Sequence, residues 1–415
     1  MERSDRRRPA PRRLMTGSLR QAAVPDVPPI GRTDEPAASR SATHRIRVLI
    51  NGIHANTGGG LTYLRNIVPA LAADDGLDLH LLIRTGQRGL FPTYDERVPV
   101  HISDAPRSLL GLLLWEQIAL PFLARRMGAD VTFSPANYGP LAAPGRVILL
   151  SNALAVGGRE TRVLKRLYWL SLSLMTGLSV LTANRVIAVS TYARRALSLG
   201  LSRLEERVVL VHHGVSRSFS PAPPPAVRDK FLLAVGDLYI QKNFHTLLRA
   251  VASLRERFPD VLLKIAGADI DPDYGCELRR IVADRGLAGH VEFLGAVDQE
   301  TLQDLYRRCR LFVFPSTVET FGMPLIEAMA CGAPIACSNA TAMPEIAGGA
   351  AAFFDPLDEA EMARVLADLI EDDRLCDDLS RKSLERARDF SWEEAASRTA
   401  AVLKSAAGHT AVTPT

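Results

Sequence analysis

The sequence predicts an α/β protein made of two Rossmann-like, doubly wound parallel-sheet domains that face a central cleft. Two arrays of alternating strand and helix patterns, separated by a proline-rich segment, carry this prediction. The chain length agrees with it, because 415 residues favour two domains at roughly 100–200 residues each. A composition of 47% apolar and 23% charged residues is typical of a globular protein rather than a disordered or fibrous one.

The first array begins at Arg45. Its expected strands are the short apolar runs 45–52, 77–84, 131–135, 146–151, 185–190 and 207–214. The stretch 58–73 has the spacing of a buried helix face, with Leu61, Leu64, Ile67 and Leu71 on one side. Strands that alternate with helices form a parallel sheet covered on both faces.

A stiff linker is expected where this pattern stops. Residues 216–227 contain four prolines between positions 221 and 225, and proline fixes φ and removes backbone donors. The alternation then restarts with expected strands at 230–236, 261–267, 291–295, 310–316 and 333–338. The expected domains are therefore 44–215 and 230–390, with a linker at 216–229 and a final helix at 391–406. Ligands of such sheets bind beyond the carboxyl ends of the strands, so the site is expected between the domains.

The N-terminal composition, the net charge, the apolar runs and the cysteines exclude several classes of protein. Residues 1–43 hold nine arginines and five acidic residues without apolar periodicity, which predicts a disordered basic tail, and Met15 is an alternative start. A net charge of +4 does not indicate nucleic-acid binding. No secretory signal is recognised. The longest apolar run, 167–181, is shorter than the ~20 residues that span a bilayer. Five cysteines without a C-x-x-C pair favour a reducing, cytoplasmic compartment over a disulfide framework or zinc ribbon.

Two turns after expected strands suit a phosphate ligand. The glycines Gly58, Gly59 and Gly60 precede a helix, whose N–H groups and positive dipole end could face an anion; a plain flexible loop is the alternative. In the second domain, Gly236 is followed by Lys242, whose charge could neutralise a diphosphate; an exposed lysine beside a helix start is the alternative.

Two carboxylates flank the expected start of another helix. Glu319 lies before it and Glu327 about one turn inside it, with Pro324 near the first helical position. Carboxylates accept several strong hydrogen bonds, so the pair could bind sugar and ribose hydroxyls together. The apolar surroundings of Glu327 argue against a simple surface position.

Several motifs together resemble the retaining glycosyltransferases of the GT-B fold, family 4. They are Glu319-Thr-Phe-Gly-Met-Pro-Leu-Ile-Glu327, Ala328-Met-Ala-Cys-Gly-Ala-Pro-Ile335, Pro344-Glu-Ile-Ala-Gly348, Gly236 with Lys242-Asn243, and His213-Gly214-Val215. The resemblance covers about 45 to 405, nearly the whole of the chain that is expected to be ordered.

The resemblance implies roles for these residues. Glu327 would hold the donor ribose, Glu319 with the backbone of Phe321 and Gly322 the donor sugar, and Lys242 the diphosphate. The loop Gly58–Gly60 would reach the same diphosphate, and backbone from Gly295 to Val297 would face the base. The last helix would return to the first domain. No metal or other cofactor is expected, because lysine and helix dipoles stabilise the charge, and the leaving phosphate would help to deprotonate the acceptor.

The sequence departs from the family pattern in two places. Many relatives carry an arginine at the positions of Asp237 or Gln241, and a histidine where this chain has Ser151-Asn152-Ala153. Asn152 is therefore a candidate for contact with the acceptor, without the role of a histidine. His54 and His245 are interpreted as structural.

The resemblance favours mannose from GDP-mannose as donor sugar and a glycan or lipid-linked acceptor, in surface polysaccharide or glycolipid synthesis. Residues 159–170 combine four basic residues with Leu164, Tyr168 and Trp169, which favours peripheral contact with an anionic membrane; an ordinary amphipathic helix is the alternative. An NDP-sugar epimerase or hydrolase of the same fold and a non-catalytic sugar-nucleotide sensor remain alternative functions.

Overall fold

The computed structural model describes residues 45–56, 58–91, 97–106, 108–151, 163–198, 204, 207–223 and 228–408. His44–Thr415 form one compact unit, which contains two parallel sheets. The expected tail, residues 1–43, lies outside the described residues.

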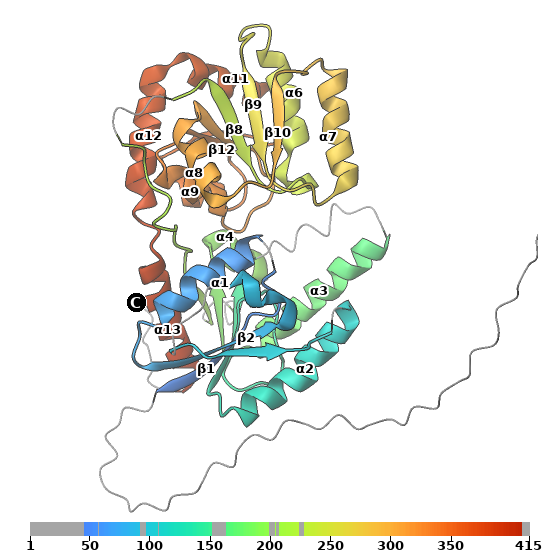
Figure 1. The fold of residues 1–415 in the computed structure, drawn as a ribbon, viewed down its shortest axis with the longest axis vertical. Helices are drawn as coiled ribbons and strands as arrows, with labels where there is room; N and C mark the ends of the chain where they lie inside the picture. Colours follow the sequence, from blue (N-terminus) through green and yellow to red (C-terminus); the bar gives the residue numbers. More distant parts are fainter. Residues whose placement is uncertain are drawn as a thin grey trace, which may run out of the picture. The chain divides into compact units, whose positions relative to one another are not determined.

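The first sheet has seven strands within the described ranges, in the order β3-β2-β1-β4-β5-β6-β7. Figure 1 labels β1 and β2 of this sheet in the domain that also carries α1, α2 and α3. All its neighbouring pairs are parallel. The strands are β1 (Ile46–Asn51), β2 (Leu77–Arg84), β3 (Val100–Ser103), β4 (Val131–Ser134), β5 (Arg146–Leu150), β6 (Arg185–Ala188) and β7 (Val208–Leu210). Its helices are α1 (Gly58–Leu71), the 3-10 turn η1 (Thr85–Leu90), α2 (Leu109–Arg126), α3 (Val163–Thr182) and α4 (Thr191–Ser198).

The strand order reverses between β1 and β4, and this determines which helices share a face. Parallel crossovers are right-handed. The step from β1 to β2 runs in one direction along the sheet, whereas the steps from β3 to β4 and from β5 to β6 run in the other. Therefore α1 covers one face, and α2 and α3 cover the opposite face. The buried side of α1 includes Leu61, Leu64, Ile67 and Leu71, as its spacing predicts.

The second sheet has six described strands in the order β10-β9-β8-β11-β12-β13, again all parallel. The strands are β8 (Phe231–Val235), β9 (Leu262–Ala266), β10 (Val291–Gly295), β11 (Leu311–Phe314), β12 (Ile335–Ser338) and β13 (Ala352–Phe354). Its helical segments are η3 (Ile240–Lys242), α6 (Phe244–Leu254), α7 (Pro272–Asp284), α8 (Gln299–Arg308), α9 (Met323–Ala330), α10 (Met343–Ala347), α11 (Glu359–Glu371) and α12 (Asp373–Ala387). Two doubly wound parallel sheets confirm the predicted fold class.

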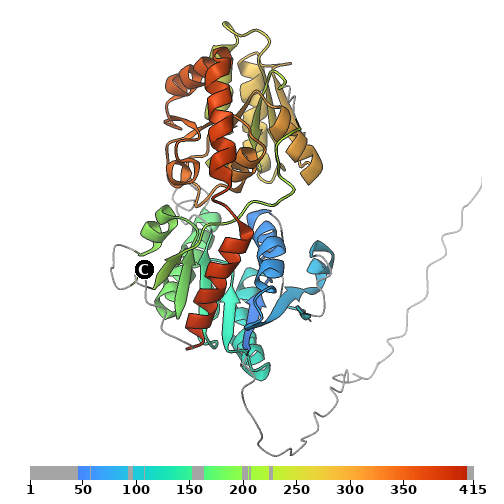
Figure 2. The ribbon, with the colours of Figure 1, turned by 90° about the vertical axis from the view of Figure 1, so that its left-hand side faces the viewer.

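The last helix, α13 (Trp392–Ala406), packs on the first sheet although it follows the second in sequence (Figure 2). It lies against α1, and Lys404 Nζ is 2.7 Å from Asp74 Oδ2. Arg185 Nε at the start of β6 donates a hydrogen bond of 3.1 Å to Ser405 Oγ. These contacts tie the end of the chain to the first domain.

Two short strands were absent from the sequence-based expectation. β3 has side chains that are half-buried or exposed along its whole length, and β13 has only one buried residue, so neither presents the continuous apolar run of a central strand. The expected strand at 207–214 was too long, because β7 ends at Leu210 and the two following histidines, His212 and His213, leave the sheet.

Candidate active site

A cavity of about 640 Å³ lies where the carboxyl ends of strands from both sheets meet. Asn51 ends β1 and Pro135 follows β4, at the reversal point of the first sheet. Gly236 follows β8 in the second sheet, and Glu319 lies on the loop after β11. Both switch points of doubly wound sheets, the usual ligand positions, therefore open into one cavity.

The first domain contributes the amino end of α1. Gly58, Gly59 and Gly60 line the cavity and are the first three residues of this helix. Gly58 has φ of 59°, a left-handed conformation that favours glycine. A Cβ on any of the three would meet no atom within 4 Å, so their neighbourhood is open. Free N–H groups at a helix start and an open space beside them are suited to an anion.

The second domain contributes Lys242, which ends η3 and lines the cavity. Its Nζ donates to Glu319 Oε1 at 2.6 Å, and both side chains are largely buried. A Cβ on Gly236 would lie 2.8 Å from Lys242 Cε, and Gly236 has φ of 152°, so this glycine leaves room for the lysine stem. Lys242 is the one lysine or arginine among the described residues that line the cavity.

Lys242 keeps its charge despite its burial. Burial alone would lower the pKa of Lys242, but the negative charge of Glu319, with smaller effects of Tyr239 and Asp237, outweighs it and raises this pKa. Asp237 also accepts a hydrogen bond from Ala268 N at 2.9 Å. The cavity therefore holds a permanent cation beside a carboxylate.

The loop between β11 and α9 carries three of the predicted residues. Glu319, Phe321 and Gly322 all line the cavity. The ring of Phe321 packs edge-on against His213, with centroids 4.9 Å apart, so its side chain belongs to an aromatic cluster. Gly322 has φ of 89° and immediately precedes α9. This arrangement leaves the backbone of the loop, rather than the phenyl ring, for a polar ligand.

Glu327 lies one turn into α9 and lines the cavity. Burial raises the pKa of Glu327 to about 7, although a hydrogen bond of 3.3 Å from the Tyr306 hydroxyl to Oε2 opposes the shift. A carboxyl group with a pKa near neutrality can donate a hydrogen bond when protonated and accept several when ionised.

The remaining predicted residues divide into two groups. Val297 lines the cavity with Ala296, whereas Gly295, which ends β10, is not among the cavity-lining residues. Asn152 lies outside the described residues, so its prediction stays a prediction. Within the described ranges, no group of three His, Cys, Asp or Glu side chains is arranged to hold a metal ion.

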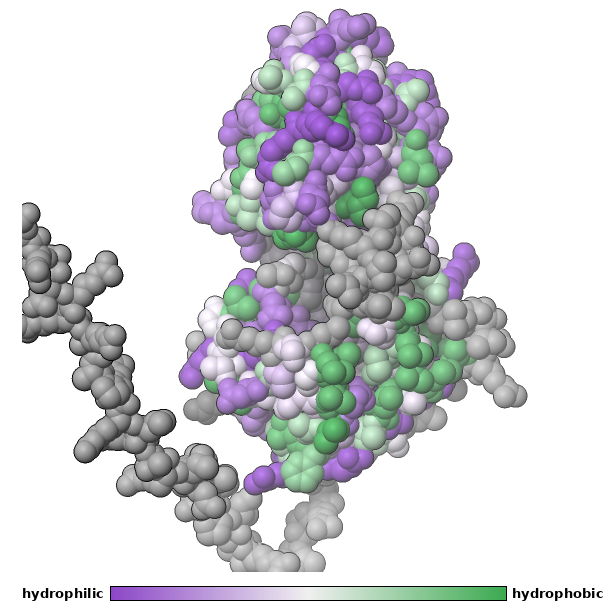
Figure 3. Space-filling model, turned by 90° about the vertical axis from the view of Figure 1, so that its right-hand side faces the viewer, coloured by the Kyte–Doolittle hydropathy of each residue, from purple (hydrophilic) through white to green (hydrophobic). Residues whose placement is uncertain are grey.

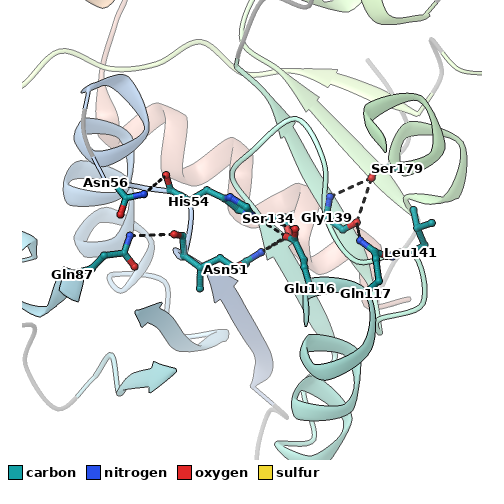
Figure 4. Close-up of polar contacts among 11 residues, drawn as sticks. Asn51, His54, Asn56, Gln87, Glu116, Gln117, Ser134, Gly139, Leu141 and Ser179 are labelled. Atoms are coloured by element: carbon teal, nitrogen blue, oxygen red, sulfur yellow. Dashed lines mark hydrogen bonds and ion pairs between the residues drawn. The ribbon is translucent and has the colours of Figure 1, made fainter. Parts of the chain in front are cut away.

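A polar cluster in the first domain was missed by the sequence analysis (Figure 4). Glu116 of α2 is fully buried and accepts a hydrogen bond of 2.7 Å from Asn51 Nδ2. His54 Nε2 lies 3.2 Å from each of its carboxylate oxygens. Asn51 and His54 line the cavity, and Asn51 Oδ1 is buried with no hydrogen-bond partner among the described residues. Two residues of the cavity wall, Asn51 and His54, are therefore held by the same buried carboxylate.

The two histidines interpreted as structural therefore differ. His245 lies beside Tyr274, with its Nδ1 3.0 Å from the tyrosine hydroxyl, away from the cavity-lining set. His54 lies in the cavity wall. The sequence signal that could have identified His54 is its position three residues beyond β1, a buried strand at a switch point. Its partner Glu116 lies 62 residues away, as the one acidic residue of a mostly apolar helix.

His213 is a further histidine in the cavity wall. Burial, with a smaller effect of the neighbouring His212, lowers the pKa of His213 to about 3. The ring is therefore neutral at physiological pH and packs with Tyr63, Phe321 and Trp392.

Comparisons with known proteins agree with this geometry. Residues 216–386 match the family described as Glycosyl transferases group 1. The chain is 31% identical over 232 residues to O-antigen chain mannosyltransferase B of Escherichia coli, covering 52% of this chain and 60% of that protein. It is 34% identical over 231 residues to phosphatidyl-myo-inositol mannosyltransferase of Mycolicibacterium smegmatis, covering 54% of this chain and 57% of that protein. The matches therefore span less than two thirds of these relatives.

A solved structure extends the likeness to both sheets. Sucrose-phosphate synthase from Thermosynechococcus elongatus superposes with a TM-score of 0.72 at 20% identity, covering 87% of this chain and 99% of that chain. At this identity the likeness establishes a shared fold.

Proposed function

We propose that the protein is a retaining glycosyltransferase of family GT4, because residues 216–386 match the glycosyl transferases group 1 family and the two-sheet fold is shared with sucrose-phosphate synthase. The donor is a nucleoside diphosphate sugar and the acceptor a glycan or lipid-linked sugar. The match over residues 216–386 supports the family that the sequence motifs indicated, and the shared fold agrees with it.

One observation carries the proposal. A cavity at both switch points is lined by a cation, Lys242, and by the amino end of a helix at Gly58–Gly60, with Glu319 and Glu327 beside them. A diphosphate matches the first pair, because lysine and helix N–H groups both stabilise anions. The hydroxyls of a ribose and a hexose match the carboxylates.

The donor would be bound mainly by the second domain. Lys242 and the Gly58–Gly60 amides bind the diphosphate, and Glu319 with the backbone of Phe321 and Gly322 binds the sugar. Glu327 binds the ribose, and the backbone around Gly295 and Val297 faces the base. Since Lys242 and Glu319 already contact each other, one residue pair aligns the diphosphate and the sugar about the bond that breaks.

The acceptor would approach from the first domain, where Asn51 and His54 line the cavity. Asn152 remains a candidate for the same role. In the transfer step the acceptor oxygen bonds to the anomeric carbon, and the bond from that carbon to the phosphate oxygen breaks. The acceptor proton passes to the leaving phosphate. The charge of Lys242 stabilises the developing diphosphate anion.

Both relatives described above are mannosyltransferases, which favours mannose as the transferred sugar. We therefore place the protein in the synthesis of a surface polysaccharide or glycolipid, with GDP-mannose as donor. Its proposed location is the cytoplasm, at the inner face of the membrane where a lipid-linked acceptor is accessible.

The test is a transfer assay with the full chain. GDP-mannose and, in parallel, UDP-glucose are incubated with octyl glycosides of mannose, glucose, galactose and N-acetylglucosamine and with phosphatidylinositol vesicles. An octyl dimannoside or mannosylated lipid with an α-linkage supports the proposal, and Lys242→Met should strongly reduce formation of this product. Free mannose or an epimerised nucleotide sugar without acceptor indicates the hydrolase or epimerase. Donor binding without any turnover indicates the sensor.

A further inference from the structure

The outer side of α2 carries a continuous apolar stripe. Leu110, Leu114, Ile118 and Phe122 are spaced four residues apart, so they lie on one side of the helix. Their side chains are 69%, 53%, 70% and 67% exposed. A helix that packs on a core normally presents polar residues on its solvent side.

The neighbouring helix α3 repeats the pattern. Leu170, Leu174, Leu178 and Leu181 are 65%, 64%, 37% and 56% exposed. These eight residues are more than half of the 14 exposed large hydrophobic residues in the described part of the chain, so the exposure is clustered rather than scattered. We call the eight residues the α2–α3 apolar face.

The two stripes lie close together on the same side of the first sheet. Gly139 bridges the helices, because its carbonyl accepts from Gln117 Nε2 of α2 and its N–H donates to Ser179 Oγ of α3, both at 3.2 Å (Figure 4). Figure 3 shows the result from outside, as adjacent hydrophobic bands on this domain.

The charges beside this face indicate its partner. Arg125 and Arg126 are exposed at the end of α2, and the first turn of α3 contains Lys165 and Arg166 in its sequence. Glu116 is the only acidic residue of these two helices, and it is fully buried on the inner side of α2. Apart from Glu116, every charged residue in the sequences of these two helices is basic. Apolar stripes on helices of this composition complement anionic headgroups above an acyl boundary. Two copies joined by a two-fold axis would instead bring like charges together.

We propose that the α2–α3 apolar face docks this protein on an anionic lipid bilayer, with both helices parallel to the membrane plane. None of the helices in the described ranges is long and apolar enough to cross a membrane. The segment 159–170, from which membrane contact was expected, lies beside this face in sequence. Residues 159–162 and the side chains of 163–169 are outside the described residues, and its last member, Leu170, belongs to the face.

Docking through α2 would bring the protein to a lipid-linked acceptor. Only this purpose of the docking, and not the docking itself, rests on the proposed function. The inner side of α2 provides Glu116, which contacts Asn51 and His54 in the cavity wall, while its outer side provides the stripe. One helix therefore connects the membrane side with the acceptor side of the cavity.

The experiment measures sedimentation of the full chain with sucrose-loaded vesicles, without donor or acceptor. Vesicles contain either phosphatidylcholine alone or phosphatidylcholine with about one third phosphatidylglycerol. The test variant is Ile118→Asp with Phe122→Asp. The matched control is Ile270→Asp with Leu357→Asp, two residues of similar exposure, 58% and 68%, elsewhere in the chain. Circular dichroism and urea unfolding check that each variant is folded.

The wild-type chain and the control should bind phosphatidylglycerol vesicles at least 10-fold more tightly than the test variant. Arg125→Glu with Arg126→Glu should weaken binding selectively at low salt. Equal vesicle binding by the test variant and wild type would overturn the proposal. The proposal would also be overturned if the wild type does not bind vesicles and light scattering shows that the wild type is a dimer and the test variant a monomer. Because no catalysis is measured, failure of the proposed function leaves this outcome unaffected.

Discussion

Lys242 is a buried cation whose paired carboxylate, Glu319, shares the cavity wall with it. We expect Lys242→Met to reduce the rate of transfer by about 100-fold, because one charge-assisted contact to a developing anion lowers the activation barrier by about 3 kcal/mol. The matched control is Lys264→Met, which removes a half-buried lysine paired with Glu292 at 3.2 Å on the second sheet. Initial rates with saturating acceptor separate the two variants, and equal rates would exclude Lys242 from the reaction.

Glu327 makes stability depend on pH. Its folded pKa of about 7 exceeds the ordinary value of 4.5, so folding favours the protonated form. Its stabilising contribution is therefore fully present below pH 4.5 and is lost as the pH rises through about 7. Glu327→Gln stays neutral throughout. We expect the Tm of this variant, relative to that of wild type, to increase between pH 5 and pH 8; a constant difference would contradict the account.

Substitutions of Glu116 can distinguish a structural role of Asn51 and His54 from a functional one. Glu116→Ala removes a fully buried carboxylate and leaves two hydrogen-bonding groups unpaired, so it should destabilise the protein by about 2–4 kcal/mol in urea unfolding.

Glu116→Gln keeps the volume but changes the partner of His54 Nε2 from a pure acceptor to a group that can donate. We expect a folded protein with unchanged GDP-mannose affinity and about 10-fold slower transfer. Transfer at the wild-type rate would remove His54 from the acceptor side.

The sequence allowed these site residues to be predicted because each lies beside a glycine turn or a helix start with a recognisable spacing. Lys242, Glu319 and Glu327 are examples. Glu116 was not readable, because its significance depends on contacts across 65 and 62 positions with Asn51 and His54. A single acid in an apolar helix does not show which residue it faces.

At the scale of elements, Gly214 determines how α13 returns to the first domain. A Cβ on this glycine would lie 2.2 Å from Trp392 N, the first backbone nitrogen of the helix, and backbone cannot move as a side chain does. Gly214→Ala should therefore cost at least about 1–3 kcal/mol in urea unfolding, the usual range for overpacking. Gly349→Ala is the control, because its Cβ would meet nothing within 4 Å. A neutral Gly214→Ala would show that α13 is not packed as described.

Central and edge elements differed in how well the sequence predicted them. The strands β1, β8 and β11 are buried along most or all of their length, so they appear as continuous apolar runs. The edge strands β3 and β13 are short and partly exposed, and only pairing with a neighbouring strand defines them. The same limit applies to α2 and α3, because the sequence alone does not show which of their apolar residues face outward.

At the scale of the whole molecule, contacts between the two sheets hold the cavity loop. Thr320 Oγ1 donates to Ser151 O at 2.6 Å, and Ser190 Oγ donates to Thr320 O at 2.5 Å. Glu345 of α10 accepts from Thr191 N at the start of α4 and lies 3.0 Å from His212 Nε2. The loop that carries Glu319 is thus fixed by both domains, which suits a ligand bound by both.

The central claim is that a nucleoside diphosphate sugar binds in this cavity between Gly58–Gly60 and Lys242. Calorimetric titration of GDP-mannose into the wild-type chain, Lys242→Met and Glu327→Ala tests it most directly, with Lys264→Met as control. We predict one site in the wild type and control, and at least 10-fold weaker binding in both cavity variants. Unchanged affinity in Lys242→Met and Glu327→Ala would contradict the claim.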